Sequence, residues 1–277
     1  MIRFAVALVA SLLLAGCAEF TGPTTRTGTS SSLVDFLYPD GQIPPRNEGA
    51  LPRLELPLTV GLAFVPAQGH YQGVLSDADR TRLLGRVRER FQGLDYVREI
   101  VVIPEVYLRT SRGFDGVDQI ARLYGLDAIA LVSYDQVRVT SDKKRSILYW
   151  TIVGAYFIEG TLNEVTTFVD TAVFDVRTRK LLFRAPGTSR LEASSTLVEA
   201  RQEARELQAK GFERAMADMT ENLGRELVLF EERIKKEKVA EVHYREGYAG
   251  GGGALSGLWL VSLLPLLAWH RRRCRGG

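Results

Sequence analysis

The most constraining feature of this chain is a long series of apolar residues spaced three and four positions apart in its C-terminal third. Because 3.6 residues complete one turn of an α-helix, such spacing places apolar side chains on one face, and charged residues fill the opposite face. The pattern predicts one long amphipathic helix over residues 196–236, whose apolar side must be covered by another layer of structure. The stripe consists of Phe212, Ala215, Met219, Leu223, Leu227, Phe230 and Ile234.

Shorter helices and strands alternate before this long helix. Ser76 with Asp79 three positions later is close to a capping box, and Gly125 is a candidate helix C-cap. Apolar runs rich in β-branched residues indicate strands, and three- and four-residue apolar spacing indicates helices. Strands are predicted at Leu58–Val65, Val97–Leu108 and Ala128–Val139, and helices at Ser76–Phe91 and Val117–Tyr124.

A meander follows the alternating elements. Residues Ile147–Ile158 are very apolar, but about twelve residues fall short of the roughly 20 that span a bilayer, so we expect a strand, with a buried helix as the alternative. A hairpin is predicted from Val165–Val176 and Lys180–Arg184. Together these elements predict an α/β (α+β) fold: a single domain with a mixed sheet, helices packed on one face of it, and a long C-terminal helix.

Composition suggests where this domain begins and ends. Residues 17–53 are rich in Thr, Ser, Gly and Pro and are expected to form a flexible tether. Within them, Val34–Tyr38 is a small apolar island that can dock onto the domain. We therefore expect a globular domain over residues 54–237 and a glycine-rich linker over residues 238–253.

The N-terminus carries a targeting signal. Arg3 precedes an apolar stretch, Phe4–Leu14, that is too short to span a bilayer. The sequence then resembles a bacterial lipobox, which implies removal of residues 1–16 and attachment of diacylglycerol to Cys17. Ala18 in place of an aspartate favours transport to the outer membrane. The alternative is an ordinary secretory signal with an incidental cysteine. The lipobox residues are Leu14, Ala15, Gly16 and Cys17.

The C-terminus carries a second signal. Ala254–Trp269 is apolar and would span roughly 24 Å as a helix, which makes it a short transmembrane segment for a bilayer core of ~30 Å. Gly257 and Pro265 weaken that helix from within. The arginines behind it favour a cytoplasmic end by the positive-inside rule. Four glycines precede the segment and an arginine cluster follows it: Gly250, Gly251, Gly252, Gly253, then Arg271, Arg272 and Arg273.

This tail resembles the GlyGly-CTERM sorting signal, whose bearers are substrates of rhombosortase, a rhomboid-family intramembrane protease. With a lipobox at the other end, the chain resembles the rhombotarget lipoprotein family, and Thr151–Gly160 and Val169–Gly187 also fit that family. The resemblance implies a processing route and names no biochemical activity. A permanent C-terminal anchor is the alternative. The resemblance implies cleavage among Ala254, Leu255, Ser256 and Gly257.

Charge and cysteine content exclude several classes. The formal charge is +3, but Arg3 and four tail arginines contribute +5, so residues 17–253 carry about −2. No basic stripe remains to indicate a nucleic-acid partner. The two cysteines, Cys17 and Cys274, both lie in targeting segments, so the domain must be held together by its core without a disulfide.

Catalytic motifs are nearly absent. The chain has no phosphate-binding GxxxxGK[ST] loop, no GxSxG elbow and no HExxH helix, and His70 is the only histidine within the expected domain. We expect no metal and no cofactor. Several acidic residues are candidates for catalytic or metal-binding groups, but helix-start, turn or sheet-edge roles are favoured for them. For Gly187-Thr188-Ser189, which follows Pro186, a loop is favoured. These acidic residues are Asp77, Asp79, Asp115, Asp118, Asp127, Asp170 and Asp175.

The favoured interpretation is a non-enzymatic lipoprotein of the bacterial envelope that is sorted to the outer membrane or cell surface. Its expected partners are lipoprotein-processing enzymes, a rhomboid-family protease, membrane lipid and an unidentified envelope protein. One alternative is an envelope enzyme that uses His70 and nearby carboxylates. Another is a tether between two membranes with the tail uncleaved.

Overall fold

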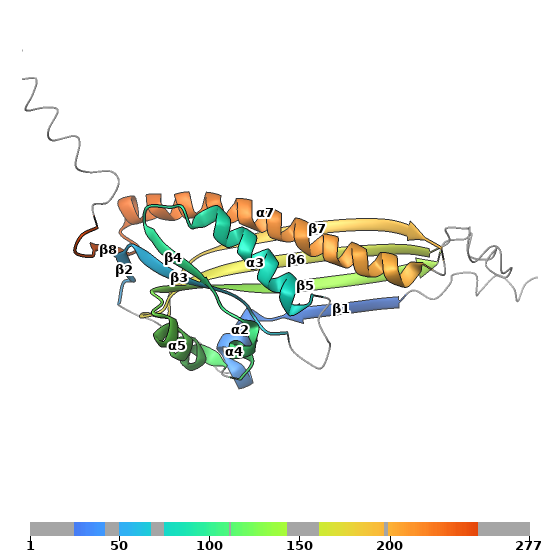
Figure 1. Ribbon diagram of the computed structural model, residues 1–277, viewed down its shortest axis with the longest axis horizontal. Helices are drawn as coiled ribbons and strands as arrows, with labels where there is room; N and C mark the ends of the chain where they lie inside the picture. The colour runs from blue at the N-terminus through green and yellow to red at the C-terminus, as the bar shows by residue number, and fades with distance from the viewer. Residues whose placement is uncertain are drawn as a thin grey trace, which may run out of the picture.

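The computed structural model describes residues 25–41, 50–67, 75–110, 112–142, 161–196 and 199–248. They form an elongated domain of three layers, in which a mixed sheet separates α3 and α7 from α2, α4 and α5 (Figure 1). The predicted α/β class with a large mixed sheet and a long C-terminal helix is confirmed. The prediction that helices cover only one face of the sheet was wrong, because the sheet is apolar on both sides and each side has its own core.

The main sheet has the strand order β4-β3-β5-β6-β7. β3 pairs in parallel with β4 and with β5, whereas β5, β6 and β7 are antiparallel neighbours. The parallel pairs are linked by helices on opposite faces, and the antiparallel strands form the predicted meander. The bounds are β3 Leu58–Phe64, β4 Val97–Val102, β5 Ala128–Asp142, β6 Thr161–Asp175 and β7 Leu181–Ser195.

A strand near the N-terminus, β1 (Thr25–Ser31), extends the sheet beyond the end of β3. Val132 of β5 lies opposite Phe64 of β3, and only two residues later Tyr134 lies opposite Ser31 of β1. The expected flexible tether over residues 17–53 is therefore wrong for residues 25–41. The backbone of β5 continues past β3, and β1 satisfies its N–H and C=O groups.

The apolar island within that segment docks as expected. It forms α2 (Leu33–Leu37), and its Phe36 and Leu37 side chains are buried in the second core. A 3-10 turn, η1 (Pro39–Gly41), follows it. The folded domain thus begins at least by Thr25, before the expected boundary at residue 54.

The first face of the sheet is covered by α3 (Asp77–Phe91) and α7 (Ala200–Glu237), as the apolar spacing predicted. The Ser76 hydroxyl oxygen accepts a hydrogen bond from the Asp79 amide at 3.1 Å and caps α3. From the predicted stripe of α7, the following are fully buried against the sheet: Phe212, Ala215, Met219, Leu223 and Phe230.

The second face is covered by α2, α4 (Glu105–Thr110) and α5 (Gly113–Tyr124). The predicted strand Val97–Leu108 is correct only as far as Val102, because Pro104 precedes a helix in which Leu108 is buried. Proline lacks an N–H and pre-sets φ near −65°, so it favours a helix start here. Gly125 ends α5 with φ +63°, as predicted for its C-cap.

The hairpin of β6 and β7 is confirmed, but β7 is longer than expected. Pro186 to Ser189 lie within it, so the predicted loop there is wrong. Gly187 explains the difference, since a Cβ atom at this position would lie 2.6 Å from Met219 Cβ and closer still to the Ala215 carbonyl oxygen of α7. Only glycine lets the helix pack this close to the strand.

A second, two-stranded sheet joins distant parts of the chain. β2 (Arg53–Leu56) pairs in parallel with β8 (Glu241–Tyr244). The expected linker over residues 238–253 is therefore wrong at residues 241–244, which fold back onto the domain. The alternation of apolar Val242 and Tyr244 with polar neighbours is the strand pattern in that stretch.

The predicted strand Ile147–Ile158 lies outside the described residues. Among the residues that the structure describes, no helix combines the length and apolar character that a bilayer crossing requires. The predicted transmembrane segment, residues 254–269, lies outside them.

Candidate functional site

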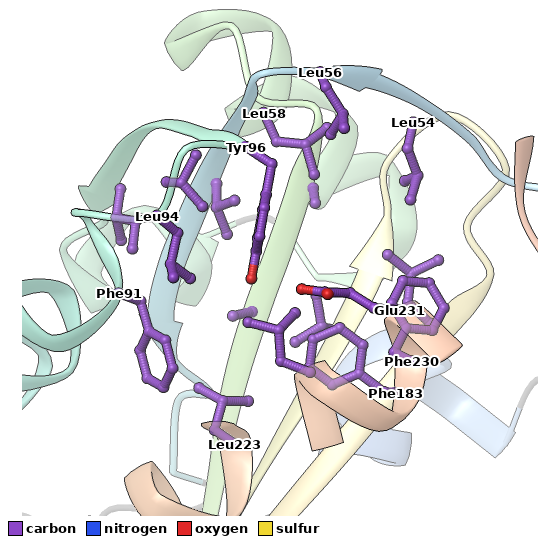
Figure 2. A pocket seen from close by; sticks show the side chains of 18 of the residues that line it. Leu54, Leu56, Leu58, Phe91, Leu94, Tyr96, Phe183, Leu223, Phe230 and Glu231 are labelled. Atoms are coloured by element: carbon purple, nitrogen blue, oxygen red, sulfur yellow. The ribbon is translucent and has the colours of Figure 1, made fainter. Parts of the chain in front are cut away.

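A partly open apolar cavity of about 440 Å³ lies at the end of the domain occupied by β2 and β8, between the sheet and α7 (Figure 2). Its floor comes from the first halves of β3 and β5. Ala128 and Ala130 have small side chains, which leave space between the sheet and the helix layer here. Val60 and Leu62 of β3 complete the floor.

The walls are the ends of two helices. α7 contributes the last part of its apolar stripe, including Leu223, Leu227 and Ile234. Phe91 at the end of α3 and Leu94 in the following turn face them from the other side (Figure 2). The amphipathic stripe of α7 is thus divided, because its middle packs on the sheet and its last turns line the cavity.

The rim is formed by β2 and β8, through Leu54, Leu56, Val242 and Tyr244. Arg245 fixes this ribbon to the main sheet, because its guanidinium lies 2.5 Å from the Asp127 carboxylate at the start of β5. Arg177 in the β6–β7 turn lies 3.1 Å from Glu55 of β2. Two ion pairs therefore hold the rim over the floor, and neither faces the cavity's apolar interior.

Tyr96 and Glu231 bring polar atoms into this apolar space. Figure 2 shows their side chains pointing toward each other from opposite walls. Burial raises the pKa of the Tyr96 hydroxyl far above its usual value, and the neighbouring Glu231 carboxylate adds to that shift. The hydroxyl therefore stays protonated, with the Glu231 carboxylate in front of it (Figure 2).

The cavity is partly open, so water can enter it, but its walls are almost entirely apolar. Water gains little inside walls that offer few hydrogen-bond partners. The cavity is within the size range of ligand pockets, about 300–1,000 Å³, and an apolar ligand matches its walls.

The residues that the sequence singled out for processing lie outside the described residues. These are Leu14, Ala15, Gly16 and Cys17 at one end, and Gly250 to Gly257 and Arg271 to Arg273 at the other. His70 also lies outside them. The structure therefore neither gathers these residues into a site nor separates them.

The acidic residues weighed as catalytic or metal-binding groups are mostly paired with basic ones. Asp115 and Asp118 both contact Arg179, at 3.1 Å and 2.5 Å. Asp127 contacts Arg245, Asp170 contacts Arg184 at 2.9 Å, and Asp175 accepts from the Thr178 amide at 2.8 Å. Across residues 25–248, gaps aside, no three His, Cys, Asp or Glu side chains are grouped so as to hold a metal ion. Asp115 lies in the first turn of α5 and Asp175 begins the β6–β7 turn, as expected. The sheet-edge role expected for Asp170 was wrong, because β6 is an interior strand between β5 and β7.

Sequence analysis missed this pocket because its parts are far apart in the chain. The floor lies on β3 and β5, one wall ends α7, and the rim joins residues 53–56 to residues 241–244. One available signal was the alternation of Leu54 and Leu56, and of Val242 and Tyr244, in segments assigned to a domain edge and a linker. Apolar side chains on alternate positions need a partner surface.

Comparisons with known proteins give no family for the chain. No family model matches it, and no curated protein does. The solved structures it resembles include a putative neuraminyllactose-binding hemagglutinin homolog from Helicobacter pylori, with 7% identity and a TM-score of 0.37 over 69% of this chain and 97% of that one.

Two further likenesses are weaker. PelC from Paraburkholderia phytofirmans, a dodecamer, has 11% identity and a TM-score of 0.25 over 70% of this chain and 98% of that one. The hypothetical protein CT253 from Chlamydia trachomatis has 12% identity and a TM-score of 0.24 over 64% and 95%. At these scores the likenesses establish neither a shared fold nor a shared function.

Proposed function

We propose that this protein is a non-enzymatic lipoprotein of the bacterial envelope that binds an apolar ligand in the pocket between β3, β5 and α7. The observation that carries the proposal is a cavity of about 440 Å³ with nearly all-apolar walls. A core that only had to be stable would close such a space, since interiors pack at the density of organic crystals.

The polar chemistry of the described residues supports a binding role over a catalytic one. The carboxylates considered above are engaged by arginines or by backbone and hydroxyl donors. Inside the pocket, the polar side chains that point toward each other are Tyr96 and Glu231, while Tyr244 and Lys235 line its mouth. A general acid or base needs a pKa near the working pH, and Tyr96 is shifted in the opposite direction.

The proposal includes both processing steps expected from the sequence, acylation of Cys17 and cleavage among Ala254 to Gly257 by a rhomboid-family protease. The geometry of the domain fits a role at a membrane. Thr25 pairs with Thr140 at one end of β5, whereas the pocket lies beside Ala128 at the other end. Twelve strand residues span about 40 Å, so the two ends of the chain leave the domain far apart.

This separation also sets the largest distance between two membranes that an uncleaved chain could link. Eight residues from Cys17 to Thr25 reach at most about 28 Å, and six from Tyr248 to Ala254 at most about 21 Å. Added to the ~40 Å along β5, an uncleaved chain spans roughly 90 Å between its two membrane attachments. A tether is therefore limited to membranes that come within this distance.

The binding proposal is tested with the uncharged fluorescent probe N-phenyl-1-naphthylamine and the full chain held in amphipol. We expect saturable binding of one probe per chain. Ala130→Leu fills the floor and Leu227→Trp fills the wall, so each should weaken probe binding at least tenfold. Val228→Phe is the matched control, because Val228 is 56% exposed on α7 and does not line the pocket.

Two results would overturn the proposal. One is probe binding that does not saturate. The other is saturable binding that both pocket-filling variants leave unchanged while circular dichroism shows them folded. The Val228→Phe protein should bind the probe as the unmodified chain does.

The processing steps are tested by intact-mass analysis of the protein from its native membrane, with and without the rhomboid-type protease. We expect an acylated N-terminus at Cys17 and a C-terminus near Gly253 when the protease is present. A mature protein that keeps Arg271 to Arg273 in cells with an active protease would refute the cleavage step and make the tail a lasting anchor.

A further inference from the structure

We infer that the pocket takes a single acyl chain of an uncharged membrane lipid, and that Glu231 excludes the corresponding fatty-acid anions. The inference rests on the proposed function and names the ligand class of the same pocket. Acyl chains match walls formed by leucine, valine and phenylalanine side chains, and a pocket with few polar groups uses those groups to select the ligand head.

The polar group offered to a ligand is an acceptor. The Tyr96 hydroxyl points toward the Glu231 carboxylate (Figure 2), and its raised pKa keeps it from ionising, so its one proton is directed to Glu231. A carboxylate has several lone pairs, so Glu231 can accept a further bond from a ligand hydroxyl or amide. A ligand carboxylate in the same place would set two negative charges side by side in apolar surroundings, which is strongly unfavourable.

Among the described residues that line the pocket, one side chain is cationic. Lys235 lies one turn beyond Glu231 on α7 and is exposed to solvent. Arg233 does not line the pocket, and its guanidinium lies over the Phe230 ring, 5.6 Å from the centroid. A fatty-acid anion could reach it only with its head outside the pocket, where water screens the attraction. The buried part of the site therefore selects against anions, and Lys235 at the mouth does not reverse that selection.

The position of the pocket indicates a membrane as the source of the ligand. Tyr244 lines the mouth, is 66% exposed, and stacks on Tyr248 with ring centroids 5.9 Å apart. Tyrosine is enriched at membrane–water interfaces, where one side of the ring is apolar and the hydroxyl is wet. Ala254, where the apolar tail begins, is six residues beyond Tyr248, at most about 21 Å. In the uncleaved precursor, a bilayer that holds the tail would lie within this distance of Tyr248, beside the mouth.

The test uses the full chain in phosphatidylcholine vesicles and two photoreactive diazirine probes with the same oleoyl chain. One probe is a monoacylglycerol and the other is the free fatty acid. Mass spectrometry of the labelled peptides measures how much of each probe crosslinks to the segments 58–62 and 223–231, which contain lining residues from two sides of the pocket. We expect the monoacylglycerol to label these peptides at least tenfold more than the fatty acid at pH 8.

Glu231→Gln should reduce this ratio to within about threefold, because it removes the charge and keeps a hydrogen-bonding side chain. Glu232→Gln is the matched control, since Glu232 is the exposed neighbour that does not line the pocket, and the ratio should stay at its original value. Equal labelling by the two probes in the unmodified chain would overturn the inference, as would a ratio that Glu231→Gln leaves unchanged.

The outcomes separate this inference from the proposed function. If neither lipid labels the pocket while N-phenyl-1-naphthylamine still binds and pocket-filling variants abolish that binding, the pocket binds apolar ligands and the acyl-lipid inference is wrong. If the naphthylamine probe also fails to bind, the proposed function itself is wrong.

Discussion

Replacing Gly187 with alanine should push apart β7 and α7, which pack closely at this position. The new Cβ atom would lie 2.6 Å from Met219 Cβ and closer still to the Ala215 carbonyl oxygen. Carbon atoms in good contact are about 3.5–4.0 Å apart, so α7 must move by roughly 1 Å. A gap of that size forfeits a quarter to a half of each dispersion contact along the buried stripe.

Because the obstructing atoms belong to the helix backbone and a Cβ atom, no side-chain rotation can relieve this clash. Overpacking of this kind costs about 1–3 kcal/mol, and we expect the upper end, about 3 kcal/mol. For a domain of this size, that corresponds to a fall in Tm of roughly 6–12 °C.

The assay is chemical unfolding followed by far-ultraviolet circular dichroism on the full chain in amphipol. Gly85→Ala is the matched control. Gly85 lies inside α3, and a Cβ atom there would meet nothing within 4 Å. That change should raise the free energy of unfolding by about 0.5–1 kcal/mol, because alanine is the better helix former. A loss below about 1 kcal/mol for Gly187→Ala would refute the close-packing argument.

Three further predictions use the same unfolding assay. Ser76→Ala should cost about 1 kcal/mol at pH 7. The Ser76 hydroxyl lowers the pKa of Asp79 below 3.8. Asp79 therefore contributes stability that is present above that pH and is lost as the pH falls through the lowered pKa. A Ser76→Ala variant with unchanged acid sensitivity would contradict this. The Arg80 guanidinium is buried and lies 2.5 Å from the Glu105 carboxylate. Glu105→Ala should cost about 3 kcal/mol, because it leaves this guanidinium without its buried partner. A loss near zero would be inconsistent with that ion pair. Gly125→Ala should cost about 1 kcal/mol from the positive φ alone, since a Cβ atom there has open space, and a much larger loss would mean an unrecognised clash.

Local periodicity was enough to predict several elements. The helix of α7, the helix of α3 with its Ser76 cap, the C-cap at Gly125 and the strand from Ala128 were all predicted and are confirmed. Each depends on spacing and capping within one segment, and those signals do not require knowledge of the partner surface.

The pocket could not be predicted in the same way. Its residues belong to stretches of residues 54–62, 87–100, 128–130, 173–183, 223–235 and 242–244, and no local pattern shows which of them meet. Phe212 and Leu227 belong to one helical stripe, yet Phe212 is fully buried and does not line the pocket, whereas Leu227 lines it and is only half-buried. Spacing shows which side of a helix is apolar, but not whether that side is covered by side chains or left beside a cavity.

By itself, the sequence determined the α/β class, the long helix and the sites expected to be processed at both ends, because each is written in a contiguous run of residues. Tertiary structure decided that Thr25–Ser31, a polar segment without apolar alternation, is a strand. It becomes one because β5 extends beyond β3 and its exposed backbone groups need partners. Glu241–Tyr244 does carry apolar alternation, but only the tertiary structure shows that its partner is β2. Such choices depend on backbone groups that only the assembled sheet brings within hydrogen-bonding distance.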